Sequence, residues 1–195
     1  MPLTNKVALV TGGSSGIGLA IAKALAKEGC RVAIAARDTE KLRQAAESYQ
    51  GSASLVWHPC DVADRQAVEK LFAWLQETLG TVDILVNAAG INIRRRAVAE
   101  LDPADWDRVI AVNLNGAFYC IRAALEQMRP KREGLIINIS SISGKRALKY
   151  SGVAYCASKF GMTALGTCVG LEEWPNGIRV TNIYPGEVDT PILDH

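Results

Sequence analysis

The chain has 195 residues, of which 49% are hydrophobic and 22% charged, and its formal net charge is +2. This length and composition predict a single globular domain, residues 1–195, with a substantial core. A net charge this close to zero gives no general reason to expect nucleic acid or an anionic membrane surface as a partner.

The strand pattern that starts at Lys6 leaves no room for a signal peptide, and no apolar run approaches the ~20 residues that cross a bilayer. Five scattered cysteines show neither a disulfide framework nor metal-ligand spacing. We therefore expect a soluble cytoplasmic protein without a metal site.

Short apolar runs alternate with segments of helical periodicity along the whole chain. Strands are predicted at Lys6–Thr11, Arg31–Ala36, Ala53–His58, Val82–Asn87, Leu135–Ser140 and Ile178–Ile183. Helices are predicted at Gly16–Glu28, Thr39–Tyr49, Asp64–Leu79, Pro103–Arg129, where Pro130 should end the helix, and Val153–Glu173. Continuous apolar strands are typical of a parallel sheet covered on both faces. The alternation predicts an α/β fold with a Rossmann-like, doubly wound parallel sheet of six visible strands.

The turn after the first strand carries Gly12, Gly16 and Gly18 and leads directly into a helix. Glycines permit a tight turn and a close approach of the backbone to a pyrophosphate, and the helix N-terminus offers free N–H groups. Ordinary βα turns also use glycine. The position between the first strand and a helix is what favours a dinucleotide site here.

Tyr155 and Lys159 lie one turn apart on the same face of a predicted helix. A phenol has an ordinary pKa of about 10, and a nearby ammonium lowers it. The pair therefore suits proton donation and acceptance near neutral pH. A tyrosine at the edge of the core beside a solvated lysine is the alternative.

Together these motifs resemble the compact branch of the short-chain dehydrogenase/reductase family. The resemblance rests on the glycine turn Thr11–Gly18, Asn87-Ala88-Ala89-Gly90, Ser141, Tyr155-x-x-x-Lys159, and Pro185-Gly186 with Val188-Asp189-Thr190. It covers essentially the whole chain. It implies cofactor contacts from Gly12, Ser14, Ser15, Gly16, Ile17, Gly18, Asp61, Val62, Asn87, Ala88, Ala89, Gly90, Tyr155, Lys159, Pro185, Gly186, Val188 and Thr190.

Arg37 bears on the choice of cofactor. NAD sites usually place an acidic residue at the end of the second strand, where it binds the ribose 2′-OH. Here that position is Ala36, and Arg37 follows. An arginine grips a 2′-phosphate, so NADP (NADPH) is favoured, with NAD possible. The alternative is a solvated Arg37 with Asp38 on the ribose.

The resemblance also implies the catalytic set Asn113, Ser141, Tyr155 and Lys159, with Ser141, Ser143 and Tyr155 facing the substrate. Asn113 would kink its helix and hold a water leading to Lys159. Ser141 precedes Tyr155 by fourteen residues, one more than in many members, which points to an insertion in Lys145–Gly152 and leaves Ser140 as an alternative.

The implied function is reversible hydride transfer between a nicotinamide and a ketone or secondary alcohol, with Tyr155 as general acid and base. The substrate is a small carbonyl compound such as a 3-oxoacyl thioester. Two other classes are a non-enzymatic NADP-binding sensor and an epimerase or dehydratase of the extended branch, whose glycine spacing and length differ. Basic residues at Arg94–Arg96 and at Lys145, Arg146 and Lys149 either favour an acidic substrate or form a solvated loop face.

The resemblance further implies a covering loop and a seventh strand beyond Thr190, which this sequence does not reach. We expect either a truncated product or a reduced member, with the sixth strand as an edge. Family members pack the equivalents of Pro103–Arg129 and Val153–Glu173 against a second subunit. A homodimer or homotetramer is therefore expected, with the dimer preferred.

Overall fold

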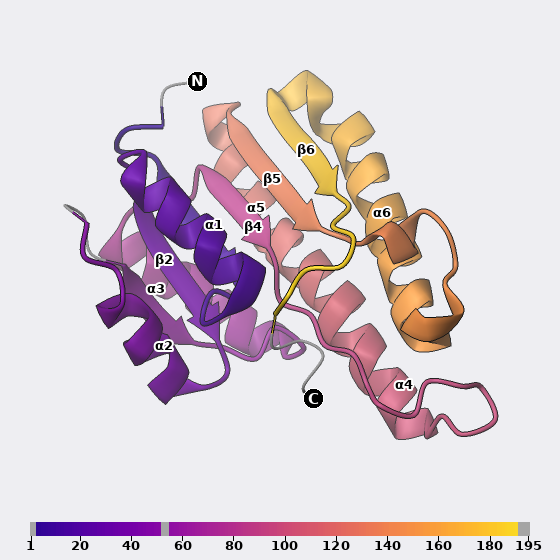
Figure 1. Ribbon diagram of the computed structural model, residues 1–195. Helices are drawn as coiled ribbons and strands as arrows, with labels where there is room; N and C mark the ends of the chain where they lie inside the picture. Colours follow the sequence, from indigo (N-terminus) through magenta and orange to yellow (C-terminus); the bar gives the residue numbers. More distant parts are fainter. Residues whose placement is uncertain (1–2, 52–54, 191–195) are drawn as a thin grey trace.

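The computed structural model describes residues 3–51 and 55–190. Its centre is a parallel sheet in the order β3-β2-β1-β4-β5-β6 (Figure 1). The strands are β1 (Val7–Thr11), β2 (Arg31–Ala36), β3 (Val56–Pro59), β4 (Ile84–Asn87), β5 (Gly134–Ile139) and β6 (Ile178–Ile183). The helices are α1 (Gly16–Lys27), α2 (Thr39–Glu47), α3 (Arg65–Thr78), α4 (Pro103–Ile110), α5 (Gly116–Lys131) and α6 (Val153–Glu173). A π-turn, η1 (Ala111–Asn115), joins α4 to α5, and short 3-10 turns lie at η2 (Ile142–Gly144), η3 (Lys149–Ser151) and η4 (Trp174–Asn176).

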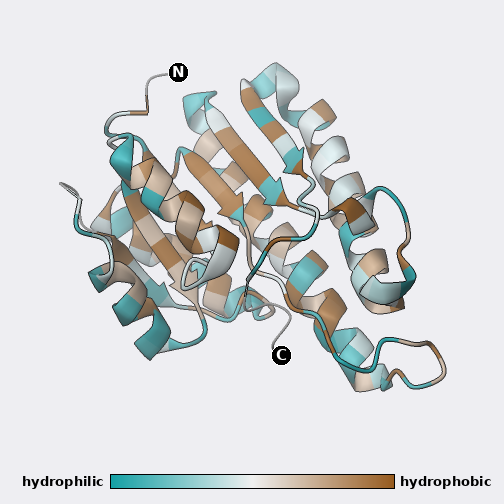
Figure 2. Cartoon of the chain, viewed as in Figure 1, coloured by the Kyte–Doolittle hydropathy of each residue, from teal (hydrophilic) through white to brown (hydrophobic). Residues whose placement is uncertain are grey.

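The helices form two layers on the sheet. Buried residues of α1 and α2 pack on one face of β1, β2 and β4. Those of α3, α5 and α6 pack on the other face. Figure 2 shows the strands mostly brown, whereas α2 is largely teal. The doubly wound α/β prediction is confirmed.

Some predicted boundaries were wrong by a few residues, for local reasons. The predicted start of the third strand at Ala53 lies outside the described residues. The fourth strand begins at Ile84 because the Val82 N–H bonds the Gln127 side chain, at 2.9 Å, instead of a neighbouring strand. Pro130 does not end its helix. It lies in the last turn, where only one backbone hydrogen bond is lost, and the helix closes at Arg132 in the left-handed region (φ 51°).

The order of the strands places the functional edge of the sheet. From β1 the chain runs outward through β2 and β3, then returns to the opposite side of β1 at β4. Such a reversal leaves a crevice at the carboxyl ends of the two central strands, where open α/β sheets bind ligands. Here those ends are Thr11 and Asn87, which are paired in register.

An asparagine ladder runs across this half of the sheet. Asn87, Asn138 and Asn182 are register partners on β4, β5 and β6. Asn87 donates to Asn138 at 2.9 Å, and Asn138 donates to Asn182 at 3.0 Å. Asn182 donates to the Thr163 carbonyl of α6 at 3.1 Å. The ladder ties three strands to the helix that carries Tyr155, although the buried Asn87 Oδ1 at its start has no hydrogen-bond partner among the described residues.

Candidate active site

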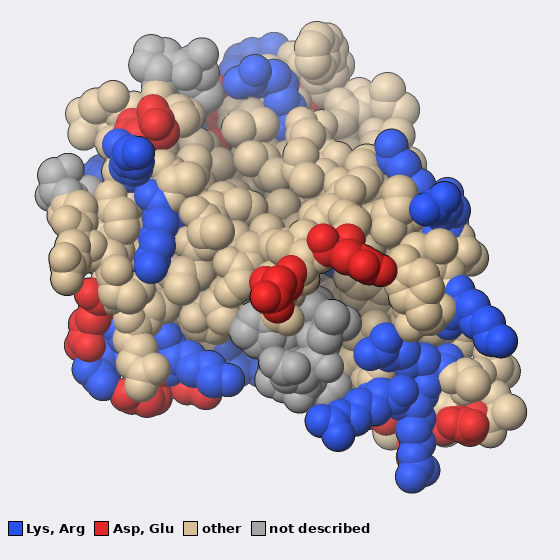
Figure 3. All heavy atoms as spheres, in the orientation of Figure 1, with Lys and Arg blue, Asp and Glu red and all other residues tan. Residues whose placement is uncertain are grey.

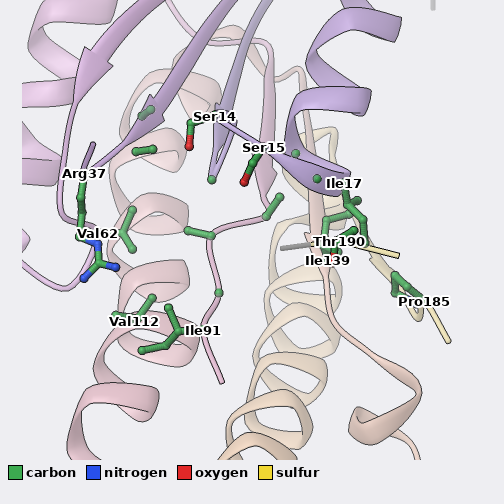
Figure 4. A pocket seen from close by; sticks show the side chains of 18 of the residues that line it. Ser14, Ser15, Ile17, Arg37, Val62, Ile91, Val112, Ile139, Pro185 and Thr190 are labelled. Carbon is green, nitrogen blue, oxygen red and sulfur yellow. The ribbon is translucent and has the colours of Figure 1, made fainter. Parts of the chain in front are cut away.

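A cleft of about 610 Å³ opens at the carboxyl ends of the strands. Figure 4 shows it extending from Arg37 beside β2, past Ser14 and Ser15, to Pro185 after β6. Most residues predicted for the site line it. They are Gly12, Ser14, Ser15, Gly16, Ile17, Gly18, Arg37, Asp61, Val62, Ala88, Ala89, Gly90, Ser141, Tyr155, Lys159, Pro185, Gly186, Val188 and Thr190.

The glycine turn forms a cradle in which backbone meets backbone. Gly12 has φ +66°, and a Cβ there would lie 2.7 Å from the Ala89 nitrogen. A Cβ on Gly18 would collide with the Gly12 carbonyl oxygen. Ser15 is the N-cap residue of α1, yet its hydroxyl makes no capping hydrogen bond. The N-terminus of α1 and this hydroxyl therefore face the cleft ready for an anion, and the residues present fit a dinucleotide.

The side chains that follow β2 give this end of the cleft a positive charge. β2 ends at Ala36, as predicted, and Arg37, Asp38 and Lys41 all line the cleft. Asp38 is the N-cap residue of α2, and its carboxylate accepts from the Lys41 N–H at 3.0 Å. One of its oxygens is therefore engaged by the helix, whereas two cationic side chains remain at the cleft. The sequence analysis did not assign Lys41 to the cofactor site. The N-cap residue Asp38, which places Lys41 in the first turn of α2, could have indicated it.

Asp61 and Val62 lie where the chain leaves β3. Asp61 is not the cap of α3, since Asp64 fills that position and accepts from Gln66 at 2.8 Å. One Asp61 oxygen accepts from the Ala63 N–H at 3.0 Å. Its exposed carboxylate lines the cleft, which agrees with the expected adenine contact.

Ser141 and Tyr155 both line the cleft, and hydrogen bonding from the Ser141 hydroxyl lowers the pKa of the phenol. Ser141 also accepts from the Ser143 N–H at 3.1 Å. The hydroxyl of the alternative, Ser140, instead bonds the Lys159 carbonyl at 3.2 Å and the Thr163 hydroxyl at 3.0 Å. Geometry therefore places Ser141 beside the phenol and engages Ser140 with the backbone of α6.

The electrostatics of Tyr155 and Lys159 differ from expectation. Burial raises the pKa of Tyr155, and the hydrogen bond from Ser141 offsets only part of the rise. Lys159 is buried, and the loss of water lowers its pKa to about 8. Its ammonium lies 5.7 Å from the centre of the Tyr155 ring and donates to the Ile139 carbonyl at 2.7 Å. The predicted lowering of the Tyr155 pKa by Lys159 is absent here, because desolvation is the largest influence on the phenol and Lys159 is not among the groups that shift its pKa.

Asn113 lies in the π-turn η1, which interrupts the long helix predicted at Pro103–Arg129. Its Oδ1 accepts from the Ile91 N–H at 2.8 Å, and its Nδ2 donates to the Ile91 carbonyl and to Ser158 Oγ. The side chain thus fixes the chain after β4 against α6, one residue from Lys159. The water expected at Asn113 stays a prediction.

Two other predicted residues lie outside the cleft lining. Asn87 faces the asparagine ladder beneath the cleft. Ser143 is 1% exposed and donates to Ser151 Oγ at 2.8 Å, so it does not face a substrate in this structure. The cleft lining also includes Asp38 and Ser140, which the sequence analysis named only as alternatives, and residues to which it gave no role: Ala35, Ala36, Lys41, Cys60, Ile91, Val112 and Ile139. Ile91 could have been predicted, because it directly follows Gly90, the last residue of the predicted cofactor turn.

The basic residues flanking the cleft behave in two ways. Figure 3 shows Lys and Arg gathered at the lower right, over the loop before α4 and the start of α6. Arg94, Arg95 and Lys149 are exposed. Arg96 is half-buried and bonded to backbone carbonyls. The arginine triplet is therefore not a uniform solvated face.

Over residues 3–51 and 55–190, the helices include none with the length and apolar character of a membrane span. Within the same ranges, no group of three His, Cys, Asp or Glu side chains is placed to hold a metal ion.

A Rossmann-like sheet with a glycine cradle and a Tyr–Lys pair in one cleft defines a dinucleotide-binding enzyme class. The short chain dehydrogenase family model matches residues 6–195, so the chain belongs to that family. An uncharacterised oxidoreductase of Staphylococcus aureus (strain MW2) is 39% identical over 97% of this chain and 81% of its own length. A 3beta-hydroxysteroid dehydrogenase of Mediterraneibacter gnavus is also 39% identical, over 97% of this chain and 68% of its own.

Solved structures agree with this family. The crystal structure of a variant actinorhodin polyketide ketoreductase with NADPH has a TM-score of 0.92 and 39% identity, over 96% of this chain and 72% of the other. Levodione reductase has a TM-score of 0.92 and 31% identity, over 98% of this chain and 75% of the other. The protein is an oxidoreductase of the short-chain dehydrogenase family with a single parallel sheet.

Proposed function

We propose that the protein reversibly reduces a small ketone to a secondary alcohol with NADPH. One observation carries the proposal: the Tyr155 phenol and the Ser141 hydroxyl line the same cleft as the glycine cradle. A hydroxyl donor beside a phenol suits a carbonyl oxygen that gains negative charge during reduction.

The residues divide the work as follows. A bound nicotinamide cofactor supplies the hydride. Tyr155 donates its proton to the carbonyl oxygen, and the raised pKa keeps the phenol protonated and ready at neutral pH. Ser141 donates a hydrogen bond to the same oxygen. Lys159 would hold the nicotinamide ribose, and Asn113 fixes the backbone that borders it.

The preference for NADPH is supported by Arg37 and Lys41, which line the cleft while Asp38 caps α2. Two cations favour a 2′-phosphate over a 2′-hydroxyl. Nicotinamide fluorescence titrations with NADPH and NADH test this. Wild type should bind NADPH at least about 10-fold more tightly, a difference of about 1.4 kcal/mol. Arg37→Asp should reverse the preference, and unchanged selectivity would remove Arg37 from this role.

The reaction itself is tested by the loss of NADPH absorbance with three ketones. These are levodione, a 3-oxosteroid and a 3-oxoacyl thioester, chosen because relatives are named for levodione, a hydroxysteroid and a polyketide. Tyr155→Phe should abolish nearly all turnover and leave NADPH binding intact. Turnover retained in Tyr155→Phe would refute the acid role, and NADPH binding without turnover of any ketone would favour a sensor.

We further infer a homo-oligomer built through α5 and α6. Both helices expose large apolar side chains, with Phe118 45% and Phe160 43% exposed. Leu171 and Trp174, at the end of α6, are 75% and 71% exposed. Burying such side chains against a second copy is favourable. Light scattering should give a dimer, and Phe160→Glu should give a monomer; a wild-type monomer would refute the inference.

A further inference from the structure

We propose that Asn92 and Arg96 form a clasp that holds residues 150–152 and thereby positions Ser141 and Tyr155 for reaction. The Asn92–Arg96 clasp belongs to the segment after β4, and its target is the segment that enters α6. The proposal rests on the ketone reduction proposed above, and it assigns positioning roles rather than catalytic ones.

Arg96 makes the first half of the clasp. Its Nη1 donates to the Tyr150 carbonyl at 2.9 Å, and its Nε donates to the carbonyl of Ile93. The guanidinium thus bridges two loops whose sequence positions are 54 residues apart. The stem packs on Gly152, the N-cap residue of α6, where an added Cβ would lie 2.5 Å from Arg96 Cβ. Gly152 has φ +82°, a conformation that also favours glycine.

Asn92 makes the second half. It is 6% exposed, and its Nδ2 donates to the Ser151 carbonyl at 3.2 Å. Its Oδ1 accepts from the Ile93 N–H at 2.8 Å, which fixes the amide within its own loop. Ile93 in turn packs with Ala154, the neighbour of Tyr155, in a small apolar cluster. Residues 150, 151 and 152 are therefore all contacted from one loop.

From Ser151 the contacts reach the reacting groups. Ser143 Oγ donates to Ser151 Oγ at 2.8 Å, and the Ser143 N–H donates to Ser141 Oγ at 3.1 Å. Ser141 in turn lowers the pKa of Tyr155, and both side chains line the cleft. Releasing the clasp frees both the start of α6 and this chain of hydroxyls. Because a reacting group displaced by about 1 Å can cost on the order of 100-fold in rate, the clasp affects turnover without touching the substrate.

The arginine triplet supplies matched variants. Arg96→Met keeps an apolar stem and removes both hydrogen bonds. Arg96→Lys keeps the charge and can donate to a single carbonyl. Arg94→Met removes the same charge from an exposed neighbour. If the arginines act by their charge alone, Arg94→Met and Arg96→Met should lower kcat equally. If the clasp acts, only Arg96→Met should lower kcat.

Three measurements test the clasp. The first is NADPH affinity by fluorescence, and the second is hydrogen exchange of residues 148–158. The third is kcat as a function of pH, measured with the one of the three ketones that the wild-type protein reduces fastest. Arg96→Met should lower kcat about 10- to 100-fold, leave NADPH affinity within about twofold, and speed exchange. The fall of kcat at high pH should move upward, because the Ser141 hydrogen bond that restrains the Tyr155 pKa is loosened. Arg96→Lys should recover part of kcat.

Other results overturn the clasp. The clasp is refuted if Arg96→Met keeps the wild-type kcat and the wild-type rate of hydrogen exchange. It is also refuted if Arg94→Met lowers kcat as much as Arg96→Met does, or if Arg96→Met loses NADPH affinity by as large a factor as it loses kcat. If Arg96→Met does not fold, Arg96→Lys decides by the same criteria. If wild type reduces no ketone, the proposed function fails, while exchange that stays unchanged in Arg96→Met still refutes the clasp by itself.

Discussion

Lys159 should destabilise the fold at neutral pH, and replacing it by methionine should reveal the cost. Its ammonium is buried, and its pKa falls from about 10.4 in an exposed lysine to about 8. A shift of this size corresponds to about 3 kcal/mol less stability for the charged folded protein. Lys159→Met also loses the hydrogen bond to Ile139, worth about 1–2 kcal/mol. We expect a net gain of about 1–2 kcal/mol in the free energy of unfolding at pH 7.

The pH dependence separates this penalty from other effects. Between pH 8 and pH 10 the folded lysine has lost its proton while the unfolded one still holds it, so wild-type stability rises with pH in that window. Methionine has no such dependence. The advantage of Lys159→Met over wild type should therefore shrink by about 1 kcal/mol at pH 9 and about 2 kcal/mol at pH 10, relative to pH 7.

Urea unfolding at each pH, with linear extrapolation, measures the difference. Both proteins should carry Tyr155→Phe, so that titration of the neighbouring phenol does not contribute. Lys149→Met, which removes an exposed ammonium, is the control for the loss of a lysine charge. If the Lys159→Met advantage is the same at pH 7 and pH 10, Lys159 is not desolvated as the structure indicates.

Three more substitutions address the cradle, the ladder and the reacting centre. Gly18→Ala should lower NADPH affinity at least about 10-fold, because its methyl group meets backbone rather than a movable side chain; unchanged fluorescence titrations would contradict the close packing. Asn138→Leu should cost about 2–4 kcal/mol in urea unfolding, since it leaves the neighbouring amides of the ladder without partners. Ser141→Ala should lower kcat about 100- to 1000-fold with little change in cofactor affinity, and a loss confined to KM would mean that Ser141 only binds substrate.

Local signals explain what the sequence could predict. The ends of β2 and β6 and both ends of α6 agree with prediction because apolar runs, glycines and prolines mark them locally. Gly12 and Gly18 could be placed in a ligand cradle because their spacing follows a strand and precedes a helix. The predicted position of Arg37 after β2 is likewise confirmed, although its role in cofactor choice stays a prediction.

The features that the sequence could not predict depend on tertiary contacts. Ser143 was expected at the substrate, yet its partner Ser151 comes from a loop whose path no periodicity reveals. The effect of Lys159 on Tyr155 depends on burial and on a carbonyl of β5, which spacing along a helix does not report. The cap at Asp38 marks the first turn of α2, where Lys41 lies, but that this turn borders the cleft emerges only from the structure.

The π-turn at Ala111–Asn115 has a consequence for how this gene can change. An α-helix turns about 100° per residue, and a π-turn accommodates one residue more than the α-helical repeat. The π-turn takes up the extra residue, so α4, which packs on α6, and α5, which packs on α3, β4 and β5, keep nearly the rotational phase of a regular helix. Deleting one residue here would restore a regular helix and leave both packed faces nearly in place. The same deletion inside α4 or α5 would instead rotate one half by about 100° relative to the other and displace an entire packed surface.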